Sequence, residues 1–183
     1  MINFLNHIQC FENILDPAIC DKIIKNSEDK TFFSSGTEGD RNKNDYRKCY
    51  DTVLDKKYDN YIFEAVGKAL TKYKEKVPYF NTGLSMEDTG YVHLLYKGSQ
   101  NGEYKIHIDQ LDIYQRIISI SFILNDNYDG GDFCFFDKKI HGDEFIVKKK
   151  KASAVVFPSN FCFPHAVLPV KNGDRHSIIT WIQ

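Results

Sequence analysis

Apolar and polar residues alternate along most of the second half of the chain, in short runs separated by turn residues. A period of two is typical of strands that bury one face, because successive side chains of a strand point to opposite sides. The alternating runs are residues 90–96, 103–109, 116–124, 132–137, 144–148, 153–158, 165–170 and 175–182. Gly-Gly at 130–131 and Asn-Gly-Asp at 172–174 mark turns between them. The pattern therefore predicts a series of short strands.

The first half of the chain has helical spacing instead. After a short apolar strand near residue 11, Asp16 is expected to cap a helix whose first residue is Pro17. A second helix is predicted over residues 56–76. The apolar faces of the two helices are predicted to be Ile19, Cys20, Ile23 and Ile24, and Tyr61, Ile62, Ala65, Val66, Leu70 and Tyr73. Residues 29–46 are polar and rich in turn formers, and are predicted to form a loop.

Helices followed by many short strands favour a mainly β fold, a jelly roll with amino-terminal helices packed outside it. Neither a repeat nor a Pro/Gly/Ser-rich linker divides the 183 residues, so residues 1–183 are predicted to form a single domain. Within it, residues 1–88 are expected to supply helical support and a lid region, and residues 89–183 the β core. Two closely packed sheets leave an open mouth in which a ligand can bind.

Composition narrows the classes of partner. The net charge of −1 argues against general affinity for nucleic acid or anionic membranes. The lysine run 148–151 has no interleaved stacking aromatics and is interpreted as a solvated turn. Neither a secretory leader nor a membrane span is expected. Five scattered cysteines without CxxC spacing favour reduced thiols over disulfides or structural zinc, and hence a cytoplasmic location.

Strand parity gathers several polar residues on shared faces, because residues i and i+2 of a strand point to the same side. The shared faces hold His107 and Asp109; His165 and Val167; and Arg175, Ser177 and Trp181. If these faces point inward, two histidines, one carboxylate and one arginine converge inside the sandwich. Two histidines and a carboxylate form the facial triad that binds iron(II) and leaves coordination positions open. Arginine is a permanently charged fork that suits a carboxylate ligand.

Each of these residues also has an ordinary structural interpretation. A lone strand histidine such as His107 is more often a packing residue than a metal ligand, and Trp181 can be simple core filling. The ordered combination favours the metal interpretation, since a buried guanidinium such as that of Arg175 needs an anionic partner. Structural or surface roles are expected for His93, His141, His176 and Arg116.

On these residues the chain resembles the iron(II)- and 2-oxoglutarate-dependent oxygenases, in the branch around the prolyl 4-hydroxylases. The resemblance rests on the HID of residues 107–109, on His165 and on the RHS of residues 175–177. It extends to the strand, Leu-Asn-Asp turn and Gly-Gly hairpin of residues 116–137 and to the carboxy-terminal segment 153–181. It covers most of the chain and is weakest between residues 29 and 88.

The resemblance implies a double-stranded β-helix that binds iron(II) and uses 2-oxoglutarate and O2 as cosubstrates, with ascorbate as a further expected cofactor. The residues it implies are His107, Asp109 and His165 as iron ligands; Arg175, Tyr96 and Ser177 as cosubstrate contacts; and Tyr104, Trp181 and Val167 in the substrate pocket. Ile123 stands where some arginine-bearing members of the family have a cosubstrate tyrosine. The loops 29–46 and 97–103 are candidate lids.

The expected reaction is hydroxylation of an unactivated C–H bond, coupled to decarboxylation of 2-oxoglutarate to succinate. Family proximity favours a prolyl residue of a peptide or protein as the substrate. Two alternatives stay open: a hydroxylase of a free amino acid or other small molecule, and a catalytically silent jelly-roll binding module.

Overall fold

Two antiparallel sheets form the framework of the protein. The computed structural model describes residues 3–36, 45–80, 86–111 and 115–183. The major sheet has seven strands in the order β1-β9-β6-β11-β4-β3-β2 and the minor sheet has four, in the order β5-β10-β7-β8. The strands of the major sheet are β1 (Gln9–Phe11), β9 (Ser153–Pro158), β6 (Ile118–Ile123), β11 (Asp174–Ile182), β4 (Val92–Lys97), β3 (Tyr50–Val53) and β2 (Phe33–Ser34). Those of the minor sheet are β5 (Tyr104–His107), β10 (His165–Val167), β7 (Phe133–Phe135) and β8 (Phe145–Val147).

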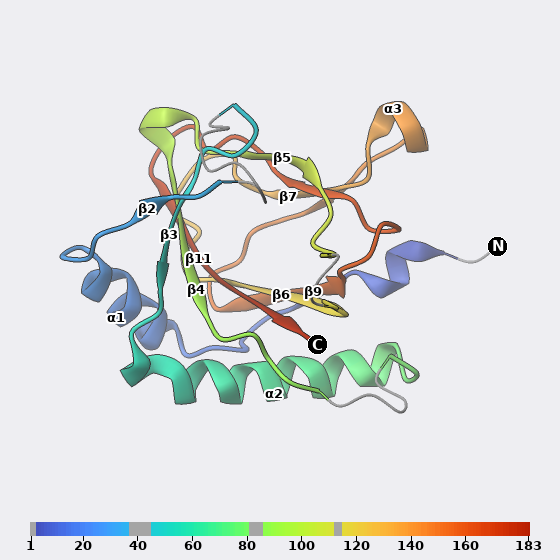
Figure 1. The fold of residues 1–183 in the computed structure, drawn as a ribbon, viewed down its shortest axis with the longest axis horizontal. Helices are drawn as coiled ribbons and strands as arrows, with labels where there is room; N and C mark the ends of the chain where they lie inside the picture. Colours follow the sequence, from blue (N-terminus) through green and yellow to red (C-terminus); the bar gives the residue numbers. More distant parts are fainter. Residues whose placement is uncertain (1–2, 37–44, 81–85, 112–114) are drawn as a thin grey trace.

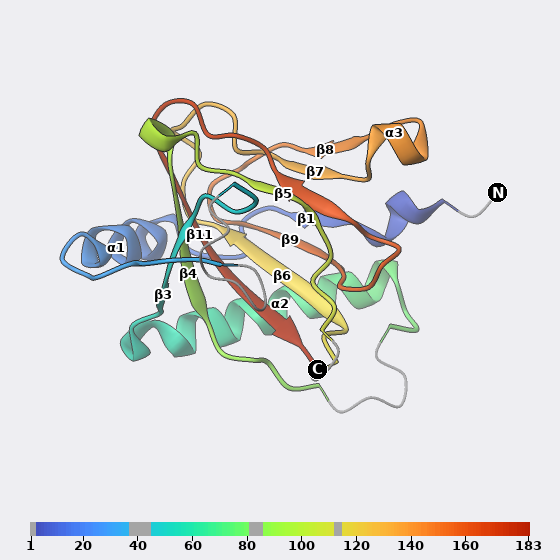
Figure 2. The same cartoon turned by 45° about the horizontal axis from the view of Figure 1, so that its top comes forward.

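The helices cover one face of the major sheet, and the minor sheet covers the other (Figures 1 and 2). The helices are α1 (Pro17–Ser27), α2 (Asp59–Lys76) and the short α3 (Lys138–His141), with 3-10 turns at Phe4–His7, Lys56–Tyr58 and Gly98–Gln100. One buried cluster lies between α1, α2 and the major sheet, and a second lies between the two sheets. The β6 strand is buried along its whole length because it packs against both layers. This layering confirms the predicted double-stranded β-helix with helices outside.

Both predicted helices are present, and their apolar faces explain their packing. Asp16 caps α1, where its Oδ1 accepts a hydrogen bond from the Ala18 amide at 2.8 Å. On α2, Ile62, Ala65, Val66, Ala69 and Tyr73 are buried. Tyr61 was expected on this face but is 50% exposed. It adjoins Ile62 in the sequence and so lies about 100° around the helix, on the solvent side.

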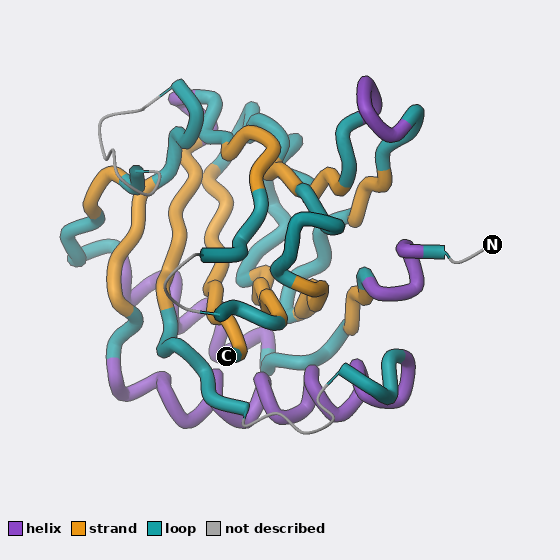
Figure 3. The backbone as a smooth tube through the Cα atoms, turned by 45° about the vertical axis from the view of Figure 1, so that its right-hand side comes forward, coloured by secondary structure: helices purple, strands orange, loops and turns teal. Residues whose placement is uncertain are grey.

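The eight alternating runs of the second half all contain a strand, and most strands are shorter than the runs. The first half contributes more strand than predicted, because β2 and β3 lie at one edge of the major sheet. Figure 3 shows the strands of the major sheet side by side, and within this sheet β3 lies between β4 and β2. Residues 29–46 therefore hold β2 as well as loop, and residues 37–44 lie outside the described part of the chain.

Membrane-spanning helices and disulfides can be assessed for the described residues. No helix among them is both long and apolar enough to pass through a bilayer. All five cysteines are free thiols, and Cys20, Cys49 and Cys134 are buried.

Candidate active site

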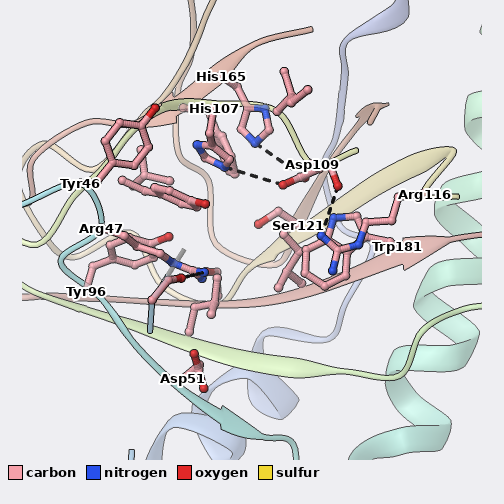
Figure 4. A pocket seen from close by; sticks show the side chains of 18 of the residues that line it. Tyr46, Arg47, Asp51, Tyr96, His107, Asp109, Arg116, Ser121, His165 and Trp181 are labelled. Atoms are coloured by element: carbon pink, nitrogen blue, oxygen red, sulfur yellow. Dashed lines mark hydrogen bonds and ion pairs between the residues drawn. The ribbon is translucent and has the colours of Figure 1, made fainter. Parts of the chain in front are cut away.

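The three predicted metal ligands converge between the sheets. His107 is the last residue of β5, Asp109 follows two positions later, and His165 is the first residue of β10. In the antiparallel pairing of β5 with β10, His165 stands opposite His107. Their imidazole nitrogens and a carboxylate oxygen all lie within 4.8 Å of one another, and Figure 4 shows the side chains pointing toward one another. In the part of the chain that the structure describes, this is the only such cluster of His, Cys, Asp or Glu.

The hydrogen bonds around the triad leave its inward-facing atoms available to a metal. His107 Nδ1 lies 2.8 Å from the Lys105 carbonyl oxygen, and His165 Nδ1 lies 3.2 Å from that of Phe163. A carbonyl only accepts, so each Nδ1–H donates and each Nε2 keeps a lone pair. Each Nε2 lies 3.7 Å from an oxygen of Asp109, too far for a hydrogen bond. Two imidazole nitrogens and one carboxylate fit iron(II) with open positions.

The charge states of the triad also suit a divalent cation. Burial, with His165 nearby, lowers the pKa of His107 to about 3, so the imidazole is neutral near pH 7. Burial acts to raise the pKa of Asp109, but the two histidines and the Ser119 hydroxyl outweigh it and lower the pKa overall. Ser119 Oγ donates to Asp109 Oδ2 at 2.7 Å. A fixed, ionised carboxylate beside the neutral imidazole of His107 is ready to bind a cation.

Arg175 provides a separate site for an anion. It lies on β11 in the major sheet and is 1% exposed. Its Nη1 donates to Ser177 Oγ at 2.7 Å, and its guanidinium carbon lies 4.9 Å from the ring centre of Tyr96. Its Nε is buried without a hydrogen-bond partner, and no described carboxylate forms an ion pair with the guanidinium. A buried guanidinium without an anion is costly, so the distal carboxylate of 2-oxoglutarate fits this position.

The triad and Arg175 line one cavity of about 850 Å³. Every other residue that the sequence predicted for cosubstrate or substrate also lines it, namely Tyr96, Ser177, Tyr104, Trp181 and Val167. Tyr104 stacks on the imidazole of His107, with ring centres 3.4 Å apart. The cavity reaches the surface, because Tyr46 and Ile108 line it and are 37% and 40% exposed.

Two arginines of the cavity were not assigned to it from the sequence. Arg116, expected to be structural, places its guanidinium carbon 3.6 Å from the ring centre of Trp181. Arg47 reaches the cavity from the residues before β3, with its guanidinium carbon 4.5 Å from the ring centre of Tyr104. Their only signal in the sequence is that arginine is rare, with four in the chain.

Other polar features lie outside the cavity. His93 and His176 pair with each other on the helix side of the major sheet, at 3.0 Å between Nε2 and Nδ1, and His141 is exposed on α3.

The proposed lid 97–103 supplies none of the described residues that line the cavity. It is bound to the neighbouring turn, since the Gly98 amide donates to the Gly173 carbonyl at 2.9 Å. That segment is part of the framework rather than a lid.

Comparison with known proteins agrees with this geometry. Residues 92–183 match the family model of the 2OG-Fe(II) oxygenase superfamily. No curated protein matches the chain in sequence.

Three solved prolyl hydroxylases share the fold at low sequence identity. One, from Trichoplax adhaerens in complex with a hypoxia inducible factor peptide fragment, is similar with a TM-score of 0.73 at 17% identity, over 97% of this chain and 83% of that one. The viral collagen prolyl hydroxylase of Paramecium Bursaria Chlorella virus-1, in its 2OG complex, gives 0.71 at 18% identity, over 96% and 95%. A Pseudomonas putida prolyl-4-hydroxylase gives 0.70 at 22% identity, over 97% and 92%.

The region that matches the family model spans half of the chain. It contains the triad, Arg175 and the strands that carry them. The chain therefore belongs to the 2OG-Fe(II) oxygenase superfamily and is an iron- and 2-oxoglutarate-dependent dioxygenase.

Proposed function

We propose that this dioxygenase hydroxylates a proline residue within a peptide or protein. The observation that carries the proposal is the path from the triad to the surface. The cavity passes Tyr104 beside His107 and opens at Tyr46 and Ile108, so an extended chain can present one residue to the metal site from outside. The fold shared with three prolyl hydroxylases supports the same substrate class.

The proposed reaction consumes one 2-oxoglutarate and one O2 for each C–H bond that is hydroxylated. The substrate C–H, 2-oxoglutarate and O2 give the C–OH product, succinate and CO2, with one oxygen atom of O2 in each of the first two products. Iron(II) held by His107, Asp109 and His165 supplies the activation of O2.

The residues of this chain bind and orient the reactants. Arg175 and Ser177 hold the distal carboxylate of 2-oxoglutarate, and the aromatic surfaces of Tyr104 and Trp181 exclude water around the reacting C–H bond. Ser119 keeps the Asp109 carboxylate oriented.

The test is a hydroxylation assay with iron(II), 2-oxoglutarate and ascorbate, read by mass spectrometry. Proline-containing peptides are compared with the same peptides in which proline is replaced by alanine, and succinate is counted against the oxygen gained. We expect a gain of one oxygen at proline only. Hydroxylation at other residues, or none in any peptide while 2-oxoglutarate is still turned over, contradicts a prolyl substrate.

One observation favours the second candidate, a free amino acid. Arg47 lines the cavity, and among the described residues no carboxylate forms an ion pair with its guanidinium, which donates to the Gly36 carbonyl at 3.2 Å and to Cys49 Sγ at 3.3 Å. A free amino acid has a carboxylate for this guanidinium, whereas a residue within a peptide has none. The same assay with free amino acids separates the two candidates, because Arg47→Met then abolishes turnover of the free amino acid but not of a neutral peptide.

A further inference from the structure

A second buried polar group lies beside Arg175 and has no assigned role. Tyr128, in the turn after β6, is 5% exposed, and its hydroxyl oxygen is buried without a hydrogen-bond partner. Tyr128 lies close enough to the Arg175 guanidinium for the two groups to interact, and the Nε of this guanidinium is also buried without a partner. Buried polar atoms are rarely left unpaired, because each costs about 1–3 kcal/mol. Two such atoms in neighbouring, interacting side chains therefore point to a function.

The two atoms are chemically complementary. The Nε–H of Arg175 can only donate, and a phenol oxygen can accept. Burial raises the pKa of Tyr128, although the nearby Arg175 acts in the opposite direction, so the phenol stays protonated. The neighbouring inward position on β6 offers no alternative, because Ile123 stands opposite Ser177 in the sheet register and carries no polar group.

The surroundings hold the Tyr128 ring in place. A Cβ on Gly131 would lie 2.7 Å from Tyr128 Cε2, and a Cβ on Gly173 would lie 3.2 Å from Tyr128 Cβ, so both glycines are needed for the close approach. Lys149 covers the ring, with its Nζ 4.7 Å from the ring centre. This lysine is therefore part of the framework, and not, as predicted, of a solvated turn.

Two turns that were predicted from the sequence pack against each other. The turn after β6 and the turn before β11 are joined by backbone hydrogen bonds, from the Asp129 amide to the Asn172 carbonyl at 3.0 Å and from the Lys171 amide to the Asp129 carbonyl at 2.9 Å. Together they carry the phenol of Tyr128 to the guanidinium of Arg175.

We propose that Tyr128 is a positioning residue for Arg175. Its hydroxyl accepts the Nε–H hydrogen bond and thereby directs the terminal nitrogens of the guanidinium toward the distal carboxylate of 2-oxoglutarate. This inference rests on the 2-oxoglutarate chemistry of the family and not on the prolyl substrate, so either can fail without the other.

The test compares two ligands in Tyr128→Phe. The zinc-loaded protein is titrated by calorimetry with 2-oxoglutarate and with 2-oxobutyrate, which has the same 2-oxo acid group but no distal carboxylate. We expect Tyr128→Phe to bind 2-oxoglutarate about tenfold or more weakly, the effect of losing one hydrogen bond to a charged group, and 2-oxobutyrate as the wild type does. Tyr73→Phe is the matched control, because Tyr73 is a buried tyrosine of α2 whose hydroxyl donates to the His7 carbonyl at 2.8 Å.

Unchanged affinity of Tyr128→Phe for 2-oxoglutarate overturns the proposal, and so does an equal loss of affinity for both ligands, which marks a general disturbance. If this variant does not fold, the wild-type protein gives the answer. With four arginines the chain has few Nε–H nuclear magnetic resonance signals, and that of Arg175 is identified by its loss in Arg175→Lys. We expect this signal to exchange slowly with solvent before 2-oxoglutarate is added, because Tyr128 accepts the hydrogen bond, and a signal that exchanges as fast as that of a solvent-exposed arginine overturns the proposal.

Discussion

His107 and His165 stand opposite each other across two antiparallel strands, with their ring centres 4.3 Å apart. The strand pairing, and not a flexible loop, therefore sets the spacing of the two imidazoles. Asp109 lies beyond the end of β5 and needs separate support, which comes from Ser119 on the major sheet. The metal site is thus assembled from both layers of the protein.

Replacing His107 with alanine is expected to abolish metal binding while leaving the fold intact. The side chain is near the edge of the minor sheet and its main role is as a ligand. Losing a ligand should weaken binding by more than the roughly 10- to 100-fold that loss of an outer partner costs. Anaerobic titration with iron(II) and 2-oxoglutarate, followed by the visible charge-transfer band, measures this. His141→Ala, on exposed α3, is the control, and a full band in His107→Ala would refute the assigned ligand.

Replacing Ser119 with alanine removes the hydrogen bond to Asp109 Oδ2 without removing a ligand. We expect metal affinity to fall by about 10- to 100-fold. Ser121→Ala is the matched control, two residues along the same strand and on the same face, where it lines the cavity. Equal metal affinities of the two variants would show that Asp109 does not depend on Ser119.

Replacing Arg175 with alanine is expected to weaken 2-oxoglutarate binding and to leave metal binding unchanged. The buried guanidinium forms no ion pair with a described carboxylate, so its removal takes away the counter-charge of the distal carboxylate. The loss should exceed tenfold, because a hydrogen bond to a charged group contributes about 1.5–3 kcal/mol and Arg175 can form two. Calorimetry on the metal-loaded protein measures both affinities. If 2-oxoglutarate binds Arg175→Ala as tightly as the wild type, its distal carboxylate binds elsewhere.

Alanine at Gly131 is expected to destabilise the protein more than alanine at Gly142. Both glycines have positive φ angles, +67° and +81°, so both substitutions strain the backbone. Only at Gly131 does the new Cβ also collide, at 2.7 Å from Tyr128 and 2.9 Å from Val170. Overpacking typically adds about 1–3 kcal/mol. Urea denaturation of the two variants gives the difference, and equal losses would mean that the ring of Tyr128 is free to move.

The paired histidines His93 and His176 are expected to make the protein less stable in acid. Burial lowers the pKa of His93 to about 3 and that of His176 to about 4, whereas an unfolded histidine titrates near 6.5. The folded state therefore binds fewer protons below about pH 6.5, and stability falls from there until the folded pKa values are reached. For His93 the loss between pH 7 and pH 5 is about 2 kcal/mol.

His93→Gln tests this pH dependence, because glutamine does not titrate. Urea denaturation of the metal-free protein at pH 7 and pH 5 should show a smaller loss of stability in His93→Gln than in the wild type. His141→Gln should keep the wild-type loss. An unaltered pH dependence in His93→Gln would mean that His93 is not held neutral in the fold.

Most residues of the site that the sequence identified are grouped by strand parity, whereas Tyr96 and Tyr104 were identified through the family resemblance. Arg175, Ser177 and Trp181 alternate on β11, so parity places them on one face, and the structure shows that this face lines the cavity. Arg47 could not be found in this way, because it precedes β3, a four-residue strand with no apolar alternation. Tyr128 was not identified either, since its position depends on two turns packing together.

The same distinction applies to the fold. The eight strand runs and the capped α1 were predictable because their signals are local. Strand β3 was not, since its residues Tyr50–Val53 form a strand through pairing with β2 and β4, which the local sequence does not encode.

Because the site is divided between the two sheets, ligand binding is linked to the conformational stability of the protein. Both histidines belong to the minor sheet, whereas Arg175 and Ser177 belong to the major sheet. A ligand that binds at both places acts as a cross-link between the sheets, and it binds only while they are packed together. Resistance of this protein to heat and to proteolysis should therefore rise with the 2-oxoglutarate concentration around it.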